Sequence, residues 1–224
     1  MISRTELAAM IDHSVLRPDS TEDDVKNGCK LAVDLGLAAV VVNPAHIPTA
    51  VASLKGSPVK ACSVIAFPFG LSAREVKLAE TRNVLALGAE EVDVVMNFSA
   101  LRSGRDTYVL DEIRGVVGVA KAHSKRVVVK LILETCYLNQ DEKKKACLLA
   151  VEGGVDFVKT STGFGPTGAT TNDVRLMRQV VGSRVGVKAA GGIRTLEQAL
   201  QMVEAGANRI GTSSSINILN ATQP

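Results

Sequence analysis

The stretch "EGGVDFVKTS", residues 152–161, joins the end of a predicted helix to a short strand through a glycine. The glycine stands at or near the first position after the helix, where a left-handed backbone is often required. The same joint recurs in "DLGLAAVVVNP" (34–44), "ALGAEEVDVVMN" (86–97) and "EAGANRIGTSS" (204–214). This repetition indicates a chain that alternates between helices and strands.

Eight short β-rich runs are predicted as strands. They are residues 11–15, 39–43, 59–66, 91–96, 127–134, 155–160, 185–190 and 208–211. Helical patterns such as "AREVKLAETRNVLALG" (73–88) lie between them, and parallel strands need crossovers of this kind. Eight such units predict one domain over residues 1–224, an α/β fold of the (β/α)8 TIM-barrel type. The competing fold, a doubly wound open sheet, normally gathers ligand residues at one switch point, whereas polar residues here follow many strands.

Composition limits the classes of function. The chain is 46% hydrophobic and 22% charged, which fits a globular protein with a large core. A net charge of +3 and an aromatic content of 3% argue against a nucleic-acid partner. The sequence has no apolar run of membrane-spanning length and no signal-peptide pattern at its start, so we expect a cytoplasmic protein without a membrane partner. The four cysteines follow no metal or disulfide pattern and are interpreted as reduced thiols.

The active site of such a barrel lies at the C-terminal ends of its strands. The polar residues predicted there are Asp12, His13, Asn43, Asp93, Asn97, Lys130, Glu134, Lys159, Thr160, Lys188, Gly191, Gly192, Gly211, Thr212, Ser213 and Ser214. No histidine cluster or carboxylate trio with metal spacing occurs among them, so neither a metal nor a cofactor is predicted. Structural interpretations stay open: Lys130 and Glu134 could each pair with their neighbours across the barrel interior, and His13 could be a hydrogen-bonded residue under a loop.

Two lysines end adjacent predicted strands, Lys159 the sixth and Lys188 the seventh, and Asp93 of the fourth strand faces the same interior. Neighbouring ammonium groups in a dry site repel each other, which favours the neutral form of one of them. Bringing a lysine pKa from about 10.4 to near 7 takes about 4–5 kcal/mol. A neutral amine attacks carbonyl carbons and forms Schiff bases. We therefore expect Lys159 to be placed where it must lose its charge.

Glycines and serines after the seventh and eighth strands predict a phosphate site. The segments "AAGGIRT" (189–195) and "GTSSS" (211–215) are each expected to open a helix. Backbone N–H groups at helix starts bind phosphate, and barrels of this type often hold phosphate after these two strands. Each turn is a weak motif alone, but its position beside two lysines strengthens the prediction.

The chain also resembles a known family, the deoxyribose-phosphate aldolases. The resemblance runs almost from end to end, and its most specific segments are "VKTSTGF" (158–164) and "KAAGGIRT" (188–195). The supporting segments are "IDHSVLRPDST" (11–21), "VVVNPAHI" (40–47), "VIAFPFG" (64–70), "EVDVVMN" (91–97), "VKLILET" (129–135) and "GTSSS" (211–215).

The resemblance implies a class I aldolase, a lyase of carbohydrate degradation. It implies reversible cleavage of 2-deoxy-D-ribose 5-phosphate to acetaldehyde and D-glyceraldehyde 3-phosphate, without a metal. By position, Lys159 matches the Schiff-base lysine, Lys188 the second active-site lysine and Asp93 the proton-relay aspartate. The residues predicted to contact substrate or its phosphate are Gly191, Gly192, Ser213, Ser214, Thr160 and Asp12.

The chain departs from the family pattern at its C-terminus. It ends in "NATQP" (220–224), without the tyrosine that some members use near the substrate. We expect sugar phosphate and aldehyde substrates and a homo-oligomer, either a dimer or a tetramer. Two alternatives stay open: another Schiff-base barrel aldolase such as a transaldolase, and a non-catalytic barrel that binds a sugar phosphate. A pure binder needs no unprotonated amine, which argues against the second.

Overall fold

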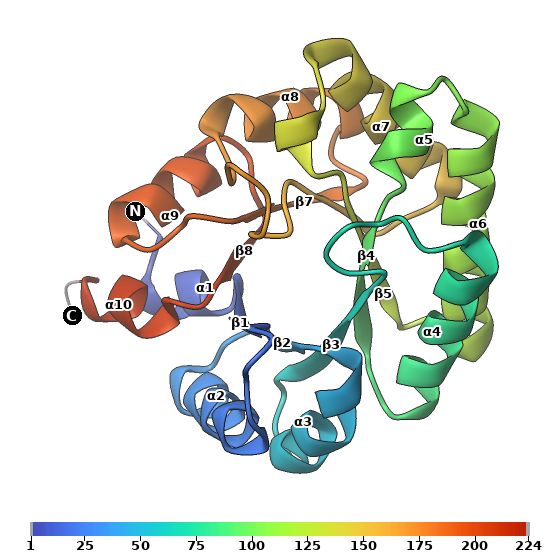
Figure 1. Cartoon of the computed structure of the whole chain (residues 1–224). Coiled ribbons are helices and arrows are strands. Elements are labelled where there is room, and N and C mark those ends of the chain that lie inside the picture. Colours follow the sequence, from blue (N-terminus) through green and yellow to red (C-terminus); the bar gives the residue numbers. More distant parts are fainter. Residues whose placement is uncertain (1, 223–224) are drawn as a thin grey trace.

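The computed structural model describes residues 2–222 as a closed barrel of eight parallel strands (Figure 1). The strands are β1 (Ile11–Val15), β2 (Ala39–Val42), β3 (Lys60–Ile65), β4 (Glu91–Val95), β5 (Val128–Ile132), β6 (Phe157–Lys159), β7 (Gly186–Ala190) and β8 (Arg209–Thr212). Each strand pairs with the next along the chain, and β8 pairs with β1 to close the barrel. This confirms the predicted (β/α)8 fold and excludes the open doubly wound sheet. The last two residues of "NATQP" lie outside the described residues.

Helices surround the barrel as an outer ring (Figure 1). They are α1 (Arg4–Ala8), α2 (Glu22–Leu35), α3 (Ile47–Leu54), α4 (Arg74–Ala86), α5 (Phe98–Arg102), α6 (Asp106–His123), α7 (Gln140–Gly153), α8 (Thr171–Val181), α9 (Leu196–Glu204) and α10 (Ser215–Asn220), with short 3-10 turns η1 (Pro44–His46) and η2 (Thr135–Tyr137). The predicted joint is present: Gly36 (φ 67°) ends α2 and Gly154 (φ 80°) ends α7 in the left-handed region. Glycine reaches this region without a Cβ clash, so the chain turns directly into the next strand.

The two faces of the strands have different surroundings. Alternate side chains such as Val92 and Val94 of β4 point outward and pack in the large core between barrel and helices. The inward-facing residues of β2 and β3 form a separate small apolar cluster of Ala39, Val41, Cys62 and Val64. The inward positions of β4 to β8 and of β1 carry most of the buried charged residues. The barrel interior is therefore apolar on one side and charged on the other.

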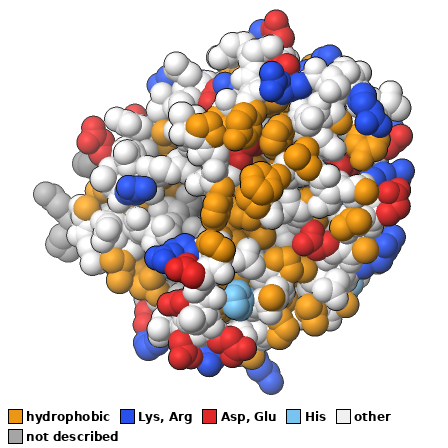
Figure 2. Space-filling view, viewed as in Figure 1, with side chains coloured by type: hydrophobic (Ala, Val, Ile, Leu, Met, Phe, Trp, Pro, Cys, Tyr) orange, Lys and Arg blue, Asp and Glu red, His pale blue; other side chains and the backbone are white. Residues whose placement is uncertain are grey.

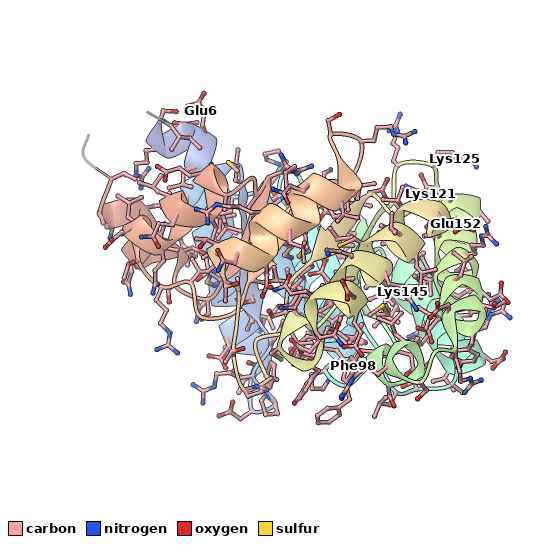
Figure 3. All side chains as sticks on the ribbon, turned by 90° about the horizontal axis from the view of Figure 1, so that it is seen from above. Glu6, Phe98, Lys121, Lys125, Lys145 and Glu152 are labelled. Atoms are coloured by element: carbon pink, nitrogen blue, oxygen red, sulfur yellow. The ribbon has the colours of Figure 1, made fainter. Side chains whose placement is uncertain are left out.

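The two ends of the barrel differ in the loops that they carry. In Figure 3, Phe98, which follows β4, lies at the opposite end from Lys125, which precedes β5. The loops after the strands therefore gather at the Phe98 end, where an active site is expected. Figure 2 shows hydrophobic side chains gathered across the middle of the face in view. No helix within residues 2–222 combines the length and the apolar character needed to cross a membrane.

Candidate active site

A pocket of about 680 Å³ opens at the C-terminal ends of the strands. Its walls come from α2 and from the segments that follow β1, β6, β7 and β8. The predicted site residues that line it are Asp12, Lys159, Lys188, Gly191, Gly192 and Ser213. Asp93 is fully buried and lies behind the pocket wall, where it contacts the two pocket-lining lysines, Lys159 and Lys188.

The three predicted catalytic side chains meet at one oxygen atom. Lys159 and Lys188 are register partners on β6 and β7, so both side chains point into the barrel. The Nζ atom of Lys159 lies 2.8 Å from Oδ2 of Asp93, and the Nζ atom of Lys188 lies 2.7 Å from the same oxygen. The sequence prediction that these groups face one another is confirmed.

The ammonium form of Lys159 is disfavoured in this position. Burial is the main cause that lowers the pKa of Lys159, and the nearby charge of Lys188 lowers it further. The carboxylate of Asp93 acts in the opposite direction, but the net shift of the pKa is downward. Lys159 is 3% exposed and lines the pocket, so a neutral amine on this residue can meet a carbonyl group.

Lys188 has the opposite behaviour, although it is buried as completely. Burial alone would lower its pKa, but the carboxylates of Asp12 and Asp93 raise the pKa of Lys188 above its ordinary value. The Nζ atom of Lys188 lies 2.5 Å from Oδ2 of Asp12. In turn the neighbouring cations, with Lys188 foremost, hold the pKa of Asp12 below its usual range despite burial. Of the two lysines at the pocket, Lys188 keeps its charge and Lys159 is the one that can lose it.

The loops after β6 and β7 approach each other closely beside these lysines. The backbone N–H of Ala169 donates to the carbonyl oxygen of Gly191 at 3.0 Å. A Cβ atom on Gly168 would lie 2.1 Å from that oxygen, so only glycine permits this approach. Thr160 serves the same junction, because its hydroxyl donates to the carbonyl of Ala190 and accepts from the Ala190 N–H. Thr160 is therefore a link between β6 and β7 and does not line the pocket.

The two predicted phosphate-binding turns differ in detail from the expectation. "AAGGIRT" precedes α9, but the capping box of Thr195 and Gln198 occupies the N–H groups of these two residues at the start of the helix. Ser213 lines the pocket, whereas Ser214 lies outside the lining and donates its N–H to Thr212 Oγ1 at 2.9 Å. The sequence analysis did not select Arg194, which also lines the pocket. Its side chain adds a cation to the same wall as Gly191 and Gly192.

The residues with open structural interpretations, Lys130, Glu134 and His13, each have defined partners in the structure. Lys130 pairs with its neighbours across the interior, as at Asp93 Oδ1 (2.9 Å). Glu134 does not follow this pattern, because its left-handed backbone (φ 55°) takes it out of the strand. Its carboxylate accepts hydrogen bonds from the N–H and the hydroxyl of Thr162, a residue of the pocket wall. His13 is hydrogen-bonded to Ser215 Oγ at 2.9 Å, and burial lowers its pKa. The interpretation of His13 as a hydrogen-bonded residue is confirmed.

The site defines a chemical class. A (β/α)8 barrel with a buried lysine of lowered pKa, a charged second lysine and a shared carboxylate has the groups of an enzyme that activates carbonyl compounds through a Schiff base. Within residues 2–222 no cluster of histidine, cysteine, aspartate or glutamate side chains has the form of a metal site.

Comparison with known proteins identifies the family. The model of the DeoC/LacD family of aldolases matches residues 7–221, and the chain belongs to this family. It is 53% identical to the deoxyribose-phosphate aldolase of Thermococcus gammatolerans, over 97% of each chain. It is 50% identical to the enzyme of the same name from Carboxydothermus hydrogenoformans, over 98% of this chain and 96% of that one. A solved tetrameric deoxyribose phosphate aldolase from Aeropyrum pernix superposes with a TM-score of 0.91 at 37% identity, covering 98% of this chain and 92% of the other.

Proposed function

We propose that this aldolase reversibly cleaves 2-deoxy-D-ribose 5-phosphate to acetaldehyde and D-glyceraldehyde 3-phosphate through a Schiff base on Lys159. Relatives about half identical over nearly the whole chain carry the name of this activity. The observation that carries the proposal is the pairing of Lys159, whose pKa is lowered, with Lys188, whose pKa is raised, on one oxygen of Asp93.

The reaction begins when the neutral Nζ of Lys159 attacks C1 of the open-chain sugar, and loss of water leaves a protonated imine. Transfer of the C3 hydroxyl proton to a base lets the C2–C3 bond break, with its electron pair moving toward the iminium. Glyceraldehyde 3-phosphate leaves, and a two-carbon enamine stays on Lys159. Protonation of the enamine at C2 and hydrolysis of the imine release acetaldehyde and restore the free amine.

Lys188 and Asp93 supply the proton-transfer groups of this cycle. Asp93 accepts hydrogen bonds from Nζ of both lysines, so it connects the nucleophile Lys159 directly to Lys188, which can carry a proton. Its pKa is held well below the usual range because three ammonium groups outweigh the effect of burial. Asp93 is therefore an ionised acceptor, and Lys188 is the protonated partner that delivers the proton toward C2.

In this proposal, the substrate phosphate binds at the pocket wall formed by Gly191, Gly192 and Ser213. Arg194 belongs to the same pocket lining and supplies a cation. These residues line the same pocket as Lys159, so one open-chain sugar phosphate can reach both ends of the site. Ser214 lies outside this lining, and its N–H donates to Thr212 Oγ1, which holds the turn that carries Ser213.

A coupled assay of acetaldehyde release, the product common to the phosphorylated and unphosphorylated sugars, tests the proposal. We expect cleavage of 2-deoxy-D-ribose 5-phosphate, much weaker cleavage of unphosphorylated deoxyribose, and no transfer of a three-carbon unit between longer sugar phosphates. Efficient three-carbon transfer would identify a transaldolase instead. Binding of the sugar phosphate without cleavage would identify the non-catalytic alternative.

A homo-oligomer and a cytoplasmic location are further parts of the proposal. The Aeropyrum pernix relative is a tetramer, and it superposes over nearly all of this chain, which supports an oligomer here. Light scattering coupled to size exclusion measures the mass in solution, and a mass equal to one chain of 23.6 kDa would contradict the oligomer.

A further inference from the structure

Charged side chains fill the barrel interior beneath the pocket and form a connected group, here called the interior charge cluster. Within residues 2–222 its members are the cations Lys130, Lys159, Lys188 and Arg209 and the carboxylates Asp12, Glu91 and Asp93. The cations outnumber the carboxylates by one. One cation is therefore left without a carboxylate of its own. A buried charge without a partner is costly, so this cation is the one most easily neutralised.

Lys130 is the cation with the most carboxylate contacts. Its Nζ atom lies 2.5 Å from Glu91 Oε2, 2.9 Å from Asp93 Oδ1 and 3.6 Å from Asp12 Oδ2. The contact with Glu91 is an ion pair without hydrogen-bond geometry, so within the described part of the chain that buried oxygen is held by charge alone. Lys130 is fully buried and does not line the pocket, so it acts on other residues rather than on the substrate.

Arg209, the first residue of β8, contacts the same cluster from the end of the strand that is away from the pocket. Its Nη1 atom lies 2.6 Å from Asp12 Oδ1 and 3.7 Å from Glu91 Oε2. Arg209 is the register partner of Lys188 on the neighbouring strand, but it is also absent from the pocket wall. Arg209 thus holds one oxygen of Asp12 while Lys188 holds the other.

Lys159 is the cation of the cluster with the fewest carboxylate contacts. It contacts only Asp93, and it shares this residue with Lys130 and Lys188. By contrast, Lys188 contacts two carboxylates, Asp12 and Asp93. The excess positive charge of the cluster therefore falls on Lys159.

We propose that Lys130, Arg209 and Glu91 are positioning residues. Their ion pairs with the carboxylates of the interior charge cluster leave the one unbalanced positive charge on Lys159, so that Lys159 is the group that gives up its proton. The proposal rests on the proposed function, because it concerns the lysine that must be neutral to attack the sugar. It assigns a task to three buried side chains that never meet the substrate.

The directions of the pKa shifts agree with this arrangement. Neighbouring carboxylates raise the pKa of Lys130 and of Arg209 against the effect of burial, whereas the pKa of Lys159 is lowered. Cys62 also faces the lysines from β3, but burial raises the pKa of its thiol, so it stays neutral and adds no charge. Asp93 and Lys188 act on the pKa of Lys159 directly. Lys130, Arg209 and Glu91 act on it through the carboxylates and cations that they contact.

Substitutions that change the cluster charge in opposite directions test the proposal. Lys130→Met removes the excess positive charge of the cluster, which raises the pKa of Lys159. The acidic limb of the pH–rate profile of Schiff-base formation, where the rate falls because Lys159 is protonated, therefore moves to higher pH by about one to two units. Glu91→Gln is nearly isosteric and increases the excess, so the same limb moves to lower pH. The double variant Lys130→Met/Glu91→Gln restores the charge count and returns the limb close to that of the unaltered enzyme.

The readout is the rate of borohydride-trapped adduct formation with acetaldehyde, measured by intact mass from pH 5 to 10. Lys143→Met is the matched control, because this lysine pairs with Asp173 outside the barrel, and we expect no shift. If Lys130→Met does not fold, Arg209→Gln takes its place, since Arg209 is partly exposed and its loss also removes one positive charge.

Shifts of equal sign in the two single variants would overturn the proposal, as would a double variant that keeps the full shift of Lys130→Met. A purely structural role of these residues would lower the rate at all pH values without moving the limb. Failure of the proposed function is distinguishable, because the unaltered enzyme would then form no adduct at any pH.

Discussion

Replacement of Lys188 by methionine removes the positive charge that shares Asp93 Oδ2 with Lys159 and keeps an unbranched side chain that is one atom shorter. The two Nζ atoms lie 2.8 Å and 2.7 Å from Asp93 Oδ2, so they are at most 5.5 Å apart. Two unit charges at that separation repel by about 3 kcal/mol when the effective dielectric constant is about 20. This energy corresponds to about two pKa units. The pKa of Lys159 should rise by up to this amount, while the larger effect of burial remains in the variant.

The assay separates this electrostatic effect from the loss of proton transfer. Below the pKa of Lys159, two pKa units reduce the neutral fraction about 100-fold, so the rate of adduct trapping with acetaldehyde falls by up to that factor. Raising the pH by about two units should restore trapping by Lys188→Met. It should not restore kcat for the sugar phosphate, because Lys188 is also the proposed proton carrier.

Lys121→Met is the control for this experiment. Lys121 forms an ion pair with Asp156 at 2.8 Å on the outside of the barrel, so its loss should leave the pH profile unchanged. Superimposable trapping profiles for the unaltered enzyme and Lys188→Met would refute the claim that Lys188 lowers the pKa of Lys159.

Three further predictions concern the phosphate, the electron sink and stability. Ser213→Asp puts a carboxylate in the pocket wall, so the KM for the phosphorylated sugar should rise roughly tenfold or more while cleavage of unphosphorylated deoxyribose is unchanged; equal losses for both would place the phosphate elsewhere. Excess chelator should leave the cleavage rate unchanged, because the iminium withdraws the electrons; inhibition reversed by zinc would contradict this. Lys77→Met should lower the free energy of unfolding in urea by about 3–5 kcal/mol, since the buried Glu112 loses its partner at 2.7 Å, and Lys77→Met/Glu112→Leu should recover most of it.

The strands and the two lysines at their ends could be predicted from the sequence because their signals are local. Every strand is a short β-rich run, and β2, β4, β6 and β8 each follow a helix end and a glycine, as at Gly154 before β6. Lys159 ends β6, and Lys188 is its register partner at an inward position of β7, so the topology alone brings them together. The topology also brings Asp93 of β4 to the same place, through the parity of its strand.

The charged layer beneath the site could not be predicted in the same way. Glu91 has the parity of Asp93 on β4, and Arg209 has the parity of Gly211 on β8, so both point inward. Both faces of a parallel strand in a barrel are buried, so alternation of polar and apolar residues is weak, and parity alone does not say which face is the interior. Their role depends on distances across the barrel, which only the closed fold sets.

The position of Glu134 depends on a backbone conformation that its residue type does not announce. A left-handed backbone is uncommon for glutamate, and nothing in "LILET" (131–135) indicates it. This turn moves the carboxylate away from Lys130 and toward the Thr162 N–H. The alternative of pairing with neighbours across the interior therefore holds for Lys130 but not for Glu134, since side-chain parity applies only while the strand continues.

Peptide mapping of the borohydride-reduced acetaldehyde adduct tests the central claim most directly. The enzyme is incubated with acetaldehyde, reduced, digested and sequenced by mass spectrometry, with Lys130 and Lys188 as internal references in the same sample. We predict a two-carbon adduct on Lys159, because its pKa is lowered and its side chain lines the pocket. An adduct on Lys188 with Lys159 unmodified would contradict the account.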